Sequence, residues 1–407
     1  MSNTNDQEVL LRVENLCQYF RSGKYENKAV DNVSFDIKKG EVFGLVGESG
    51  CGKTTTGRSI IKIYDITSGS IYFKGQRICA GVRSYQDAIK AARKEISGLK
   101  KEDPTYETRK KELEDTIARN KEEIKKARFD HKNSDKLYAK KLVEEVKAEF
   151  APKLEAAKND PGELKTLKKQ YNDALRVAKN TKLITQIQMI FQDPIASLDP
   201  RMTVREIIAE GLVINGIRDQ KYIDEKVYEI LEMVGLVREH AGRYPHEFSG
   251  GQRQRIGIAR SVVMKPDMLI ADEPVSALDV SIQAQVINLL NDLRDQLGLT
   301  ILFIAHDLSV VKYFSDRIGV MYYGNMVELA PSDELFAHPM HPYTRSLLSA
   351  IPLPDPKAEK KRTRITYNAL AAHDYSEDKP SLREIIPGHF VHCNDAEEKA
   401  YREEFGL

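Results

Sequence analysis

The feature that most constrains the fold is a glycine-rich segment at residues 47–54, which directly follows an apolar run. Its residues read Gly-Glu-Ser-Gly-Cys-Gly-Lys-Thr and match the pattern G-x-x-x-x-G-K-[ST]. The apolar run, Val42–Val46, predicts a buried strand, and a helical pattern follows the glycines. In this context backbone N–H groups converge on a phosphate at the N-terminus of a helix. The sequence therefore predicts a nucleotide-binding α/β fold.

Two polar residues of this phosphate loop have a specific expected role. Lys53 supplies a positive charge to the β and γ oxygens of the nucleotide, and the Thr54 hydroxyl can ligate Mg²⁺. Cys51 is interpreted as a small residue that fills a variable loop position, not as a reactive thiol. The candidate ATP-binding residues of the loop are Gly47, Glu48, Ser49, Gly50, Cys51, Gly52, Lys53, Thr54 and Thr55.

Two acidic residues follow a second predicted strand. Met268–Ala271 is apolar, and Asp272 and Glu273 come directly after it. At this position Asp272 can hold Mg²⁺, while Glu273 can orient or deprotonate an attacking water. His306 ends the next apolar run and could contact the γ-phosphate. Together with the phosphate loop, these residues predict a site that hydrolyses ATP.

Apolar runs that alternate with helical patterns indicate an α/β fold. Four runs predict buried central strands, namely Val42–Val46, Ile187–Phe191, Met268–Ala271 and Thr300–Ala305. A long charged segment separates the first of them from the other three. We therefore expect one domain that is interrupted by an insertion.

The charged segment runs from Arg83 to Lys182 and differs in composition from the rest of the chain. It holds 27 Lys and Arg against 19 Asp and Glu, a net charge of +8, whereas the whole chain has a net charge of +1. Apolar residues recur at every third or fourth position in Tyr106–Arg128 and Ser134–Lys158, which predicts amphipathic helices. Asp103-Pro104 and Asp160-Pro161 are typical helix starts, with Asp as the N-cap. We expect an antiparallel hairpin or small bundle of three or four helices.

The ends of the chain give two further expectations. The polar start lacks the basic-then-apolar order of a signal peptide, and no apolar run approaches the roughly 18 to 20 residues that cross a bilayer. These patterns predict a protein of the cytosol. After Pro331 the sequence becomes rich in proline and polar residues, so a C-terminal extension is expected to begin near Phe336.

A second glycine-containing motif identifies the family. Phe248-Ser249-Gly250-Gly251-Gln252 opens a helical pattern and resembles the signature motif of ATP-binding cassette (ABC) ATPases, with Phe248 where Leu is commoner. Other elements of that family follow in order. Gln192 resembles the Q-loop glutamine, Asp279 lies in a segment similar to the D-loop, and His306 resembles the switch histidine. Phe20, or with less support Tyr19, stands where these proteins place an aromatic residue that stacks on adenine.

The resemblance implies a fold and a set of site residues. We expect a mixed-sheet core of the RecA type, an antiparallel β subdomain and a helical signature subdomain. By resemblance the catalytic residues are Glu273, His306 and Gln192, and the Mg²⁺ ligands are Thr54, Gln192 and Asp272. Ser249, Gly250, Gly251, Gln252 and Asp279 would also contact ATP.

The same resemblance divides the chain into three parts. The nucleotide-binding domain comprises residues 8–81 and 183–335, and its signature subdomain spans about 193–262. The charged helical insertion comprises residues 82–182, and the small C-terminal extension comprises residues 336–407.

ABC domains of this kind act in pairs, in which the signature residues of one chain close on ATP held by the other. Because this chain has one set of motifs, the resemblance implies a second ATPase subunit. The strings FQDP with SLDPRMTV, YPHEFSGGQ and HPMHPYT resemble the ATP-binding subunits of oligopeptide and dipeptide importers. The order of motifs is most similar to the F-type subunit, whose partner is a D-type ATPase. HPMHPYT itself is interpreted as a docking linker.

An importer of this kind implies several further partners and a location. These partners are two transmembrane permease subunits and an extracytoplasmic peptide-binding protein, and the chain would lie peripherally on the cytoplasmic face of the membrane. Residues 193–217 would meet a cytoplasmic helix of the permease, in a groove lined by Met202, Val204, Ile207 and Ile208. Cys393 is the single cysteine of the extension, where many relatives carry a cysteine cluster that resembles an iron–sulfur site.

Two alternative functions remain open. A nickel or glutathione importer shares all of these motifs. A non-transport ABC ATPase could act on nucleic acid or ribosomes through the basic insertion, but the placement of the insertion before Gln192 and the single cassette argue against it. No nucleic-acid partner is therefore expected. The insertion itself could be a solvated spacer, a dock for another protein, or a contact for anionic lipid or RNA.

Overall fold

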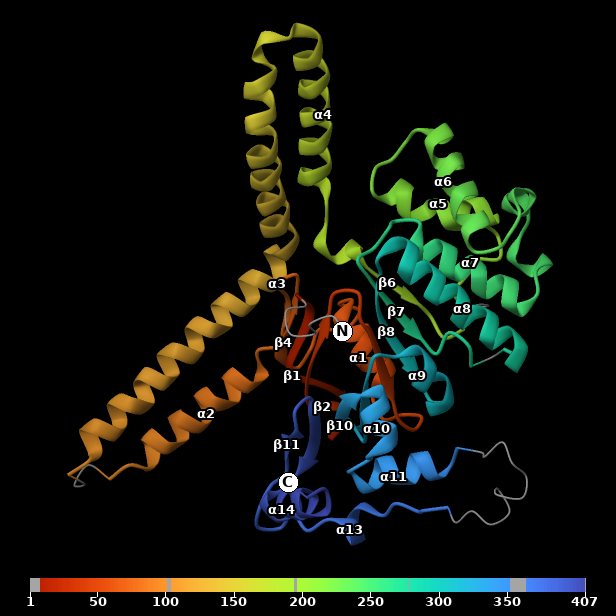
Figure 1. The fold of residues 1–407 in the computed structure, drawn as a ribbon. Helices are drawn as coiled ribbons and strands as arrows, with labels where there is room; N and C mark the ends of the chain where they lie inside the picture. The colour runs from red at the N-terminus through yellow and green to blue at the C-terminus, as the bar shows by residue number, and fades with distance from the viewer. Residues whose placement is uncertain (1–7, 101–103, 194–195, 277, 352–363, 407) are drawn as a thin grey trace.

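The chain folds as two β-sheets with helices packed around them and two long helical arms (Figure 1). This computed structural model describes residues 8–100, 104–193, 196–276, 278–351 and 364–406. Within these residues, no helix combines the length and the apolar character that a membrane crossing requires.

The larger sheet has eight strands in the order β11-β12-β10-β9-β3-β8-β7-β6. All four predicted central strands are confirmed, and they lie in this sheet with parallel neighbours. The strands are β3 (Val42–Val46), β6 (Ile187–Ile190), β7 (Met268–Asp272), β8 (Thr300–Ala305), β9 (Arg317–Tyr322), β10 (Asn325–Pro331), β11 (Ser381–Ile386) and β12 (His389–Cys393). The last two come from the C-terminal extension, so this segment is part of the main sheet.

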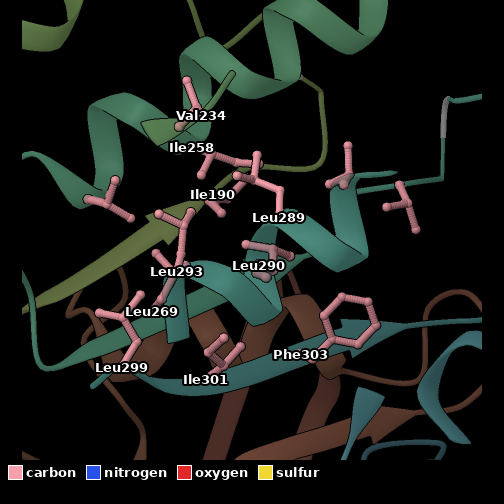
Figure 2. Packing of buried hydrophobic residues seen from close by; sticks show 14 of the residues in the cluster. Ile190, Val234, Ile258, Leu269, Leu289, Leu290, Leu293, Leu299, Ile301 and Phe303 are labelled. Atoms are coloured by element: carbon pink, nitrogen blue, oxygen red, sulfur yellow. The ribbon is translucent and has the colours of Figure 1, made fainter. Parts of the chain in front are cut away.

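The parallel strands are buried on both faces, which explains their continuous apolar sequences. In β7, Leu269 and Ala271 belong to one hydrophobic cluster, while Met268 and Ile270 belong to the cluster on the opposite face. Figure 2 shows the first of these clusters, where leucines of α8 (Val280–Leu297) lie against the sheet. Polar residues of the site, such as Glu273 and His306, directly follow these buried strands.

The second sheet is antiparallel, with the order β2-β1-β4-β5. Its strands are β1 (Val9–Ser22), β2 (Tyr25–Lys38), β4 (Ser68–Phe73) and β5 (Gln76–Ala80). The β4–β5 hairpin turns at Lys74 and Gly75, whose φ angles of 51° and 72° fit a type I′ turn. This sheet is the expected antiparallel β subdomain.

Helices cover both faces of the main sheet and form the helical subdomain. The helices around the core are α1 (Lys53–Ile60), α9 (Leu308–Phe314), α10 (Ser332–Ala337), α11 (Pro342–Ser349), α13 (Ala369–Ala372) and α14 (Asp395–Glu404), besides α8. The helical subdomain contains α5 (Val204–Ile214), α6 (Gln220–Met233) and α7 (Gly250–Val262). Short 3₁₀ turns occur at η1 (Ala157–Asn159), η2 (Leu183–Gln186), η3 (Arg238–Gly242) and η4 (Pro245–Glu247).

Within its described residues, the insertion has three helices that pair as hairpins, as expected, but two of the expected helical segments form one helix. Its described helices are α2 (Arg83–Gly98), α3 (Tyr106–Ala156) and α4 (Pro161–Asn180). The 51 residues of α3 join the two helices that the periodicity suggested, because residues 129–133 contain no glycine or proline to break the helix. At 1.5 Å per residue, the path along α3 is about 76 Å, and the helix bends between its two halves (Figure 1). Its first half pairs with α2 and its second half with α4, which gives two arms that point in different directions (Figure 1).

One of the two predicted helix starts is confirmed. Asp160 caps α4 by accepting hydrogen bonds from the backbone N–H groups of Gly162 and Glu163, with Pro161 as the first helical residue. The other was wrong, since α3 begins at Tyr106, two residues after Pro104, which lies in a turn. Asp103 lies outside the described residues.

The middle of α3 attaches the insertion to the rest of the fold. Asp130 forms an ion pair of 2.6 Å with Arg77 of β5. Tyr138 is 7% exposed and packs with the hydrophobic cluster beneath the antiparallel sheet. The Nζ of Lys74 lies 3.3 Å from the Tyr138 hydroxyl and 2.7 Å from Asp267. These contacts involve the antiparallel sheet and the starts of core strands, at a distance from the glycine-rich loop.

Candidate ATP-hydrolysis site

The phosphate loop connects β3 to α1, as the sequence predicts. Gly47, Gly50 and Gly52 have φ angles of 147°, 82° and 106°, which side chains rarely allow. A Cβ atom on Gly47 would lie 2.2 Å from the carbonyl oxygen of Met321, so glycine is required there. Glu48, Ser49 and Gly50 are exposed at the turn of the loop.

Lys53 begins α1 and points back under the loop. Its Nζ donates hydrogen bonds to the carbonyl oxygens of Gly47 at 2.7 Å and Glu48 at 2.9 Å, and the residue is 4% exposed. Cys51 is buried with its sulfur 3.7 Å from the same Nζ, and burial raises the pKa of its thiol. A buried neutral thiol is consistent with the expected packing role. Thr55 is the third residue of α1, and its carbonyl accepts a hydrogen bond from Ser59.

Thr54 in α1 forms a hydrogen bond with Asp272 at the end of β7. The Thr54 hydroxyl donates to Oδ1 of Asp272 at 2.8 Å, whereas Oδ2 of Asp272 is buried without a hydrogen-bond partner. Burial raises the pKa of Asp272. A buried carboxylate oxygen with no partner beside a hydroxyl fits a hard cation such as Mg²⁺, which prefers oxygen ligands. Gln192, the third expected Mg²⁺ ligand, lies just after the end of β6, and its side-chain amide contacts Glu273.

Glu273 lies at the centre of the predicted catalytic residues. The amide of Gln192 donates to Oε2 of Glu273 at 2.8 Å, and Nδ1 of His306 lies 3.4 Å from the same oxygen. The three residues follow β6, β7 and β8, which are adjacent strands of the sheet. Glu273 has a φ angle of 46°, a conformation uncommon for residues other than glycine. The arrangement holds one carboxylate oxygen between an amide and an imidazole, and it could orient a water molecule.

The signature residues lie in a different part of the molecule. Ser249 caps α7 and forms a reciprocal capping box with Gln252. A Cβ on Gly251 would lie 2.7 Å from the Ile282 side chain, so this glycine permits close packing against α8. Within the described residues, no hydrogen bond or ion pair joins residues 249–252 to the phosphate loop. Asp279, which precedes α8, is also exposed, and Gly250 faces the adjoining Leu278.

Phe20 is the better placed of the two candidate aromatic residues for adenine. It is 37% exposed near the end of β1 and makes an edge-to-face contact with Tyr64, with ring centroids 5.2 Å apart. The hydroxyl of Tyr19 instead bonds to Asp31, and the cations of Lys28 and Arg83 lie over its ring. The geometry favours Phe20, because its ring is the less occupied.

One residue that contacts the phosphate loop was missed by the sequence analysis. The HPMHPYT segment was interpreted as a docking linker, but it folds against the core, and Tyr343 is 1% exposed. The hydroxyl of Tyr343 accepts a hydrogen bond of 3.0 Å from the backbone N–H of Glu48. A signal for local helix structure was present, since Pro342 follows a capping His341 at the start of α11. Nothing in the string indicates where this helix packs.

A cavity of about 760 Å³ lies beside Gln192, between the core and the helical subdomain. The sequence predicted a groove here lined by four apolar residues of the 193–217 segment. Val204, Ile207 and Ile208 are instead buried in the hydrophobic core, whereas Met202 lines a second cavity of about 300 Å³ beside α5. The residue of α5 that lines the cavity with an exposed apolar side chain is Ile214, at 72% exposure.

Comparisons with known families agree with both halves of the chain. A family model described as ABC transporter matches residues 30–159 and 154–276. Another, described as the oligopeptide/dipeptide transporter C-terminal region, matches residues 327–380.

Comparisons with individual proteins cover nearly the whole chain. The oligopeptide transport ATP-binding protein OppF of Bacillus subtilis (strain 168) is 46% identical over 97% of this chain and 99% of its own length. The dipeptide transport ATP-binding protein DppF of Lactococcus lactis is 42% identical, with 98% of each chain covered.

Solved structures support the fold. CbiO1 of Clostridium perfringens, part of the ABC transporter complex cbiONQ, aligns with a TM-score of 0.51 at 21% identity, covering 82% of this chain and 92% of that one. The ATP-binding cassette MJ0796, bound to ADP and phosphate, aligns with a TM-score of 0.50 at 20% identity, covering 79% and 99%. The expected fold of an ABC-type P-loop ATPase is confirmed. The chain belongs to the ABC transporter family, in the group of oligopeptide and dipeptide transport ATP-binding proteins.

Proposed function

We propose that this chain hydrolyses ATP to power the import of oligopeptides or dipeptides across the cytoplasmic membrane. The observation that carries the proposal is the match of the whole chain, including its C-terminal region, to oligopeptide and dipeptide transport ATP-binding proteins. The relatives that match over nearly the whole chain are oligopeptide and dipeptide transport proteins, which favours peptides over the nickel and glutathione alternatives.

Glu273 is the proposed catalytic base. Its carboxylate oxygen is held by Gln192 and His306, so it can accept a hydrogen bond or a proton from water that attacks the γ-phosphate. Lys53 is the proposed phosphate ligand, and its present bonds to the Gly47 and Glu48 carbonyls keep it next to the place where phosphate would bind. Thr54, Asp272 and Gln192 would hold Mg²⁺, which would neutralise charge on the phosphates.

The proposed ATPase works as a pair of subunits. The separation of Ser249, Gly250 and Gly251 from the phosphate loop supports a role on ATP that is held by another subunit. We propose a heterodimer with a D-type ATPase. Asp279, which is exposed next to the signature helix, would lie at the same interface.

The transporter would further contain two transmembrane permease subunits and an extracytoplasmic peptide-binding protein. The cavity beside Gln192 supports this proposal, because a partner that enters it would touch both the exposed Ile214 and a residue that holds Glu273. The chain would then lie on the cytoplasmic face of the membrane as a peripheral subunit. No nucleic acid is part of the proposed function.

Uptake by cells tests the proposal. A strain that lacks this chain should fail to import labelled dipeptides or oligopeptides, and the wild-type chain should restore uptake, whereas Glu273→Gln should not. Affinity purification in mild detergent, followed by mass spectrometry, should recover two multi-span proteins and a second cassette ATPase. Restored import of nickel or glutathione but not of peptides, or recovery with ribosomes or nucleic acid, would contradict the proposal.

A further inference from the structure

The C-terminal extension reaches the ATP site through one residue of the phosphate loop. The backbone N–H of Glu48 donates to the Tyr343 hydroxyl at 3.0 Å, and the backbone carbonyl of Glu48 accepts from Lys53 at 2.9 Å. Glu48 therefore stands between Tyr343 and the lysine that is proposed to bind phosphate. The two bonded residues, Glu48 and Tyr343, are 295 positions apart in the sequence.

Tyr343 is held firmly enough to act as a fixed point. Its ring packs against those of Tyr322, at a centroid distance of 4.4 Å, and Tyr367, at 5.5 Å. Burial raises the pKa of Tyr343 far above the neutral range, so its hydroxyl stays protonated and neutral. A neutral hydroxyl has lone pairs that accept a backbone N–H bond.

The start of α11 is fixed in turn to the main sheet. The N–H groups of Met340 and His341 donate to the carboxylate of Glu328, which is fully buried in β10. The N–H of Tyr343 donates to Nδ1 of His341. The backbone at the start of α11, which carries Tyr343, is thus anchored to the main sheet.

A contact that fixes the phosphate loop before ATP binds should favour ATP binding. Its glycines give the backbone more freedom than other residues would, and this freedom is lost when the loop closes on phosphate. A bond that holds the loop before ATP arrives lowers the cost of ordering it.

We propose that Tyr343 is a positioning residue of the ATP site, through which the C-terminal extension keeps the first turn of the phosphate loop in the shape that receives nucleotide. The proposal rests on ATP binding by this chain and does not depend on what the transporter carries.

Tyr343→Phe tests the hydroxyl while it keeps the ring. The substitution leaves the N–H of Glu48 without its acceptor, so the affinity of the full chain for ATP should fall about threefold to tenfold. Tyr367→Phe is the matched control. It removes a hydroxyl from the same ring cluster, and this hydroxyl makes no hydrogen bond within the described residues. The control should bind ATP within about twofold of the wild type, by isothermal titration calorimetry.

Two further measurements separate positioning from a purely structural role. In the assembled transporter, Tyr343→Phe should raise KM for ATP with kcat changed less than about twofold, which is the pattern of lost binding. The amide of Glu48 should exchange hydrogen slowly in the wild type without nucleotide, and faster in Tyr343→Phe. A lower melting temperature with unchanged ATP affinity would overturn the proposal. Rapid exchange of the Glu48 amide in the wild type would do the same, whether or not the variant folds.

Discussion

The insertion and the C-terminal extension are both additions to the same ATPase core, yet they join it in opposite ways. The insertion touches the core at the middle of α3 and at the start of α2, where Arg83 pairs with Glu26 and lies over the Tyr19 ring. It sends two helical arms away from the core (Figure 1). The extension adds β11 and β12 to the main sheet and places Tyr343 against the phosphate loop. Within the described residues the conspicuous addition therefore makes no hydrogen bond or ion pair to the phosphate loop, whereas the inconspicuous one does.

The largest effect is expected from a substitution in the catalytic site itself, and it gives a reference for the effects of changes in the two additions. Glu273→Gln keeps the shape of the side chain but removes the carboxylate that Gln192 and His306 hold. ATP hydrolysis by the assembled transporter should fall at least about 100-fold, because general-base catalysis contributes that much. ATP binding should persist.

Lys53→Ala is the contrasting variant, since it should weaken ATP binding itself. Both quantities are measured on the same preparations, by phosphate release and by calorimetry. Wild-type turnover by Glu273→Gln would remove this residue from the catalytic assignment.

Deletion of the insertion tests whether it is as remote as its contacts indicate. Replacing residues 83–182 by a short Gly/Ser linker should lower stability by several kcal/mol, because Tyr138 and the Asp130–Arg77 pair pack on the core. The affinity for ATP should nevertheless change less than about twofold, since the insertion does not contact the phosphate loop in the described structure. Melting temperature and ATP titration measure the two effects.

A smaller deletion separates the effect of the outer arm from the effect of the attachment of α3 to the core. Replacing only the outer part of the arm, residues 146–176 of α3 and α4, by a short Gly/Ser linker leaves the attachment at Asp130 and Tyr138 in place. This variant should keep near wild-type stability and ATP affinity. A large loss of ATP affinity in either deletion would show that the insertion supports the site, and the comparison would fail.

The two additions also show how far sequence reasoning reaches. Thr54, Asp272, Glu273 and His306 were predicted as one site from the phosphate-loop motif and from the polar residues that directly follow two predicted strands, and the structure brings them together in hydrogen-bonded or ion-paired contacts. The insertion was located by charge, and α4 by its Asp-Pro start. The sequence analysis did not predict that α3 is one continuous helix. The apolar periodicity is interrupted between its two segments, and from sequence alone such an interruption resembles the end of a helix.

Tyr343 could not have been placed in the same way. Its contact with Glu48 depends on how α11 packs beside β10, and local patterns carry no such information. A string rich in His and Pro indicates a turn or linker as readily as a helix start. The contact became visible only with the tertiary fold.

Acid should weaken the extension more than the rest of the protein. Burial, together with His373, His392 and Arg345, lowers the pKa of His341 to about 3, whereas an unfolded histidine titrates near 6.5. Between these values the unfolded state binds a proton that the folded state does not. Stability from His341 is therefore full above about pH 6.5 and falls as the pH drops, by up to about 1.4 kcal/mol per pH unit.

Native-state hydrogen exchange of the α11 amides at pH 6.5 and 5.0 measures this loss, which should be about 2 kcal/mol. His341→Asn is the control, because an amide oxygen can replace Nδ1 as the acceptor for the N–H of Tyr343 but does not titrate in this range. The loss should be smaller in the variant. An equal loss in both proteins would assign the pH dependence to other groups of the extension.

The smallest expected effect concerns the attachment of the insertion. Arg77 and Asp130 form a partly buried ion pair, with side chains 11% and 25% exposed. The double-mutant cycle of Arg77→Ala and Asp130→Ala should give a coupling energy of about 1 kcal/mol, near the upper end for exposed pairs. ATP affinity should be the same in all four proteins of the cycle.

The ion pair is far weaker than the buried packing of Tyr138. Its loss should therefore loosen α3 locally without detaching it, and faster hydrogen exchange around residue 130 would detect this change. If the ATP affinities of the four proteins also showed coupling between Arg77 and Asp130, the insertion would influence the phosphate loop. The two additions would then no longer differ in their relation to the site.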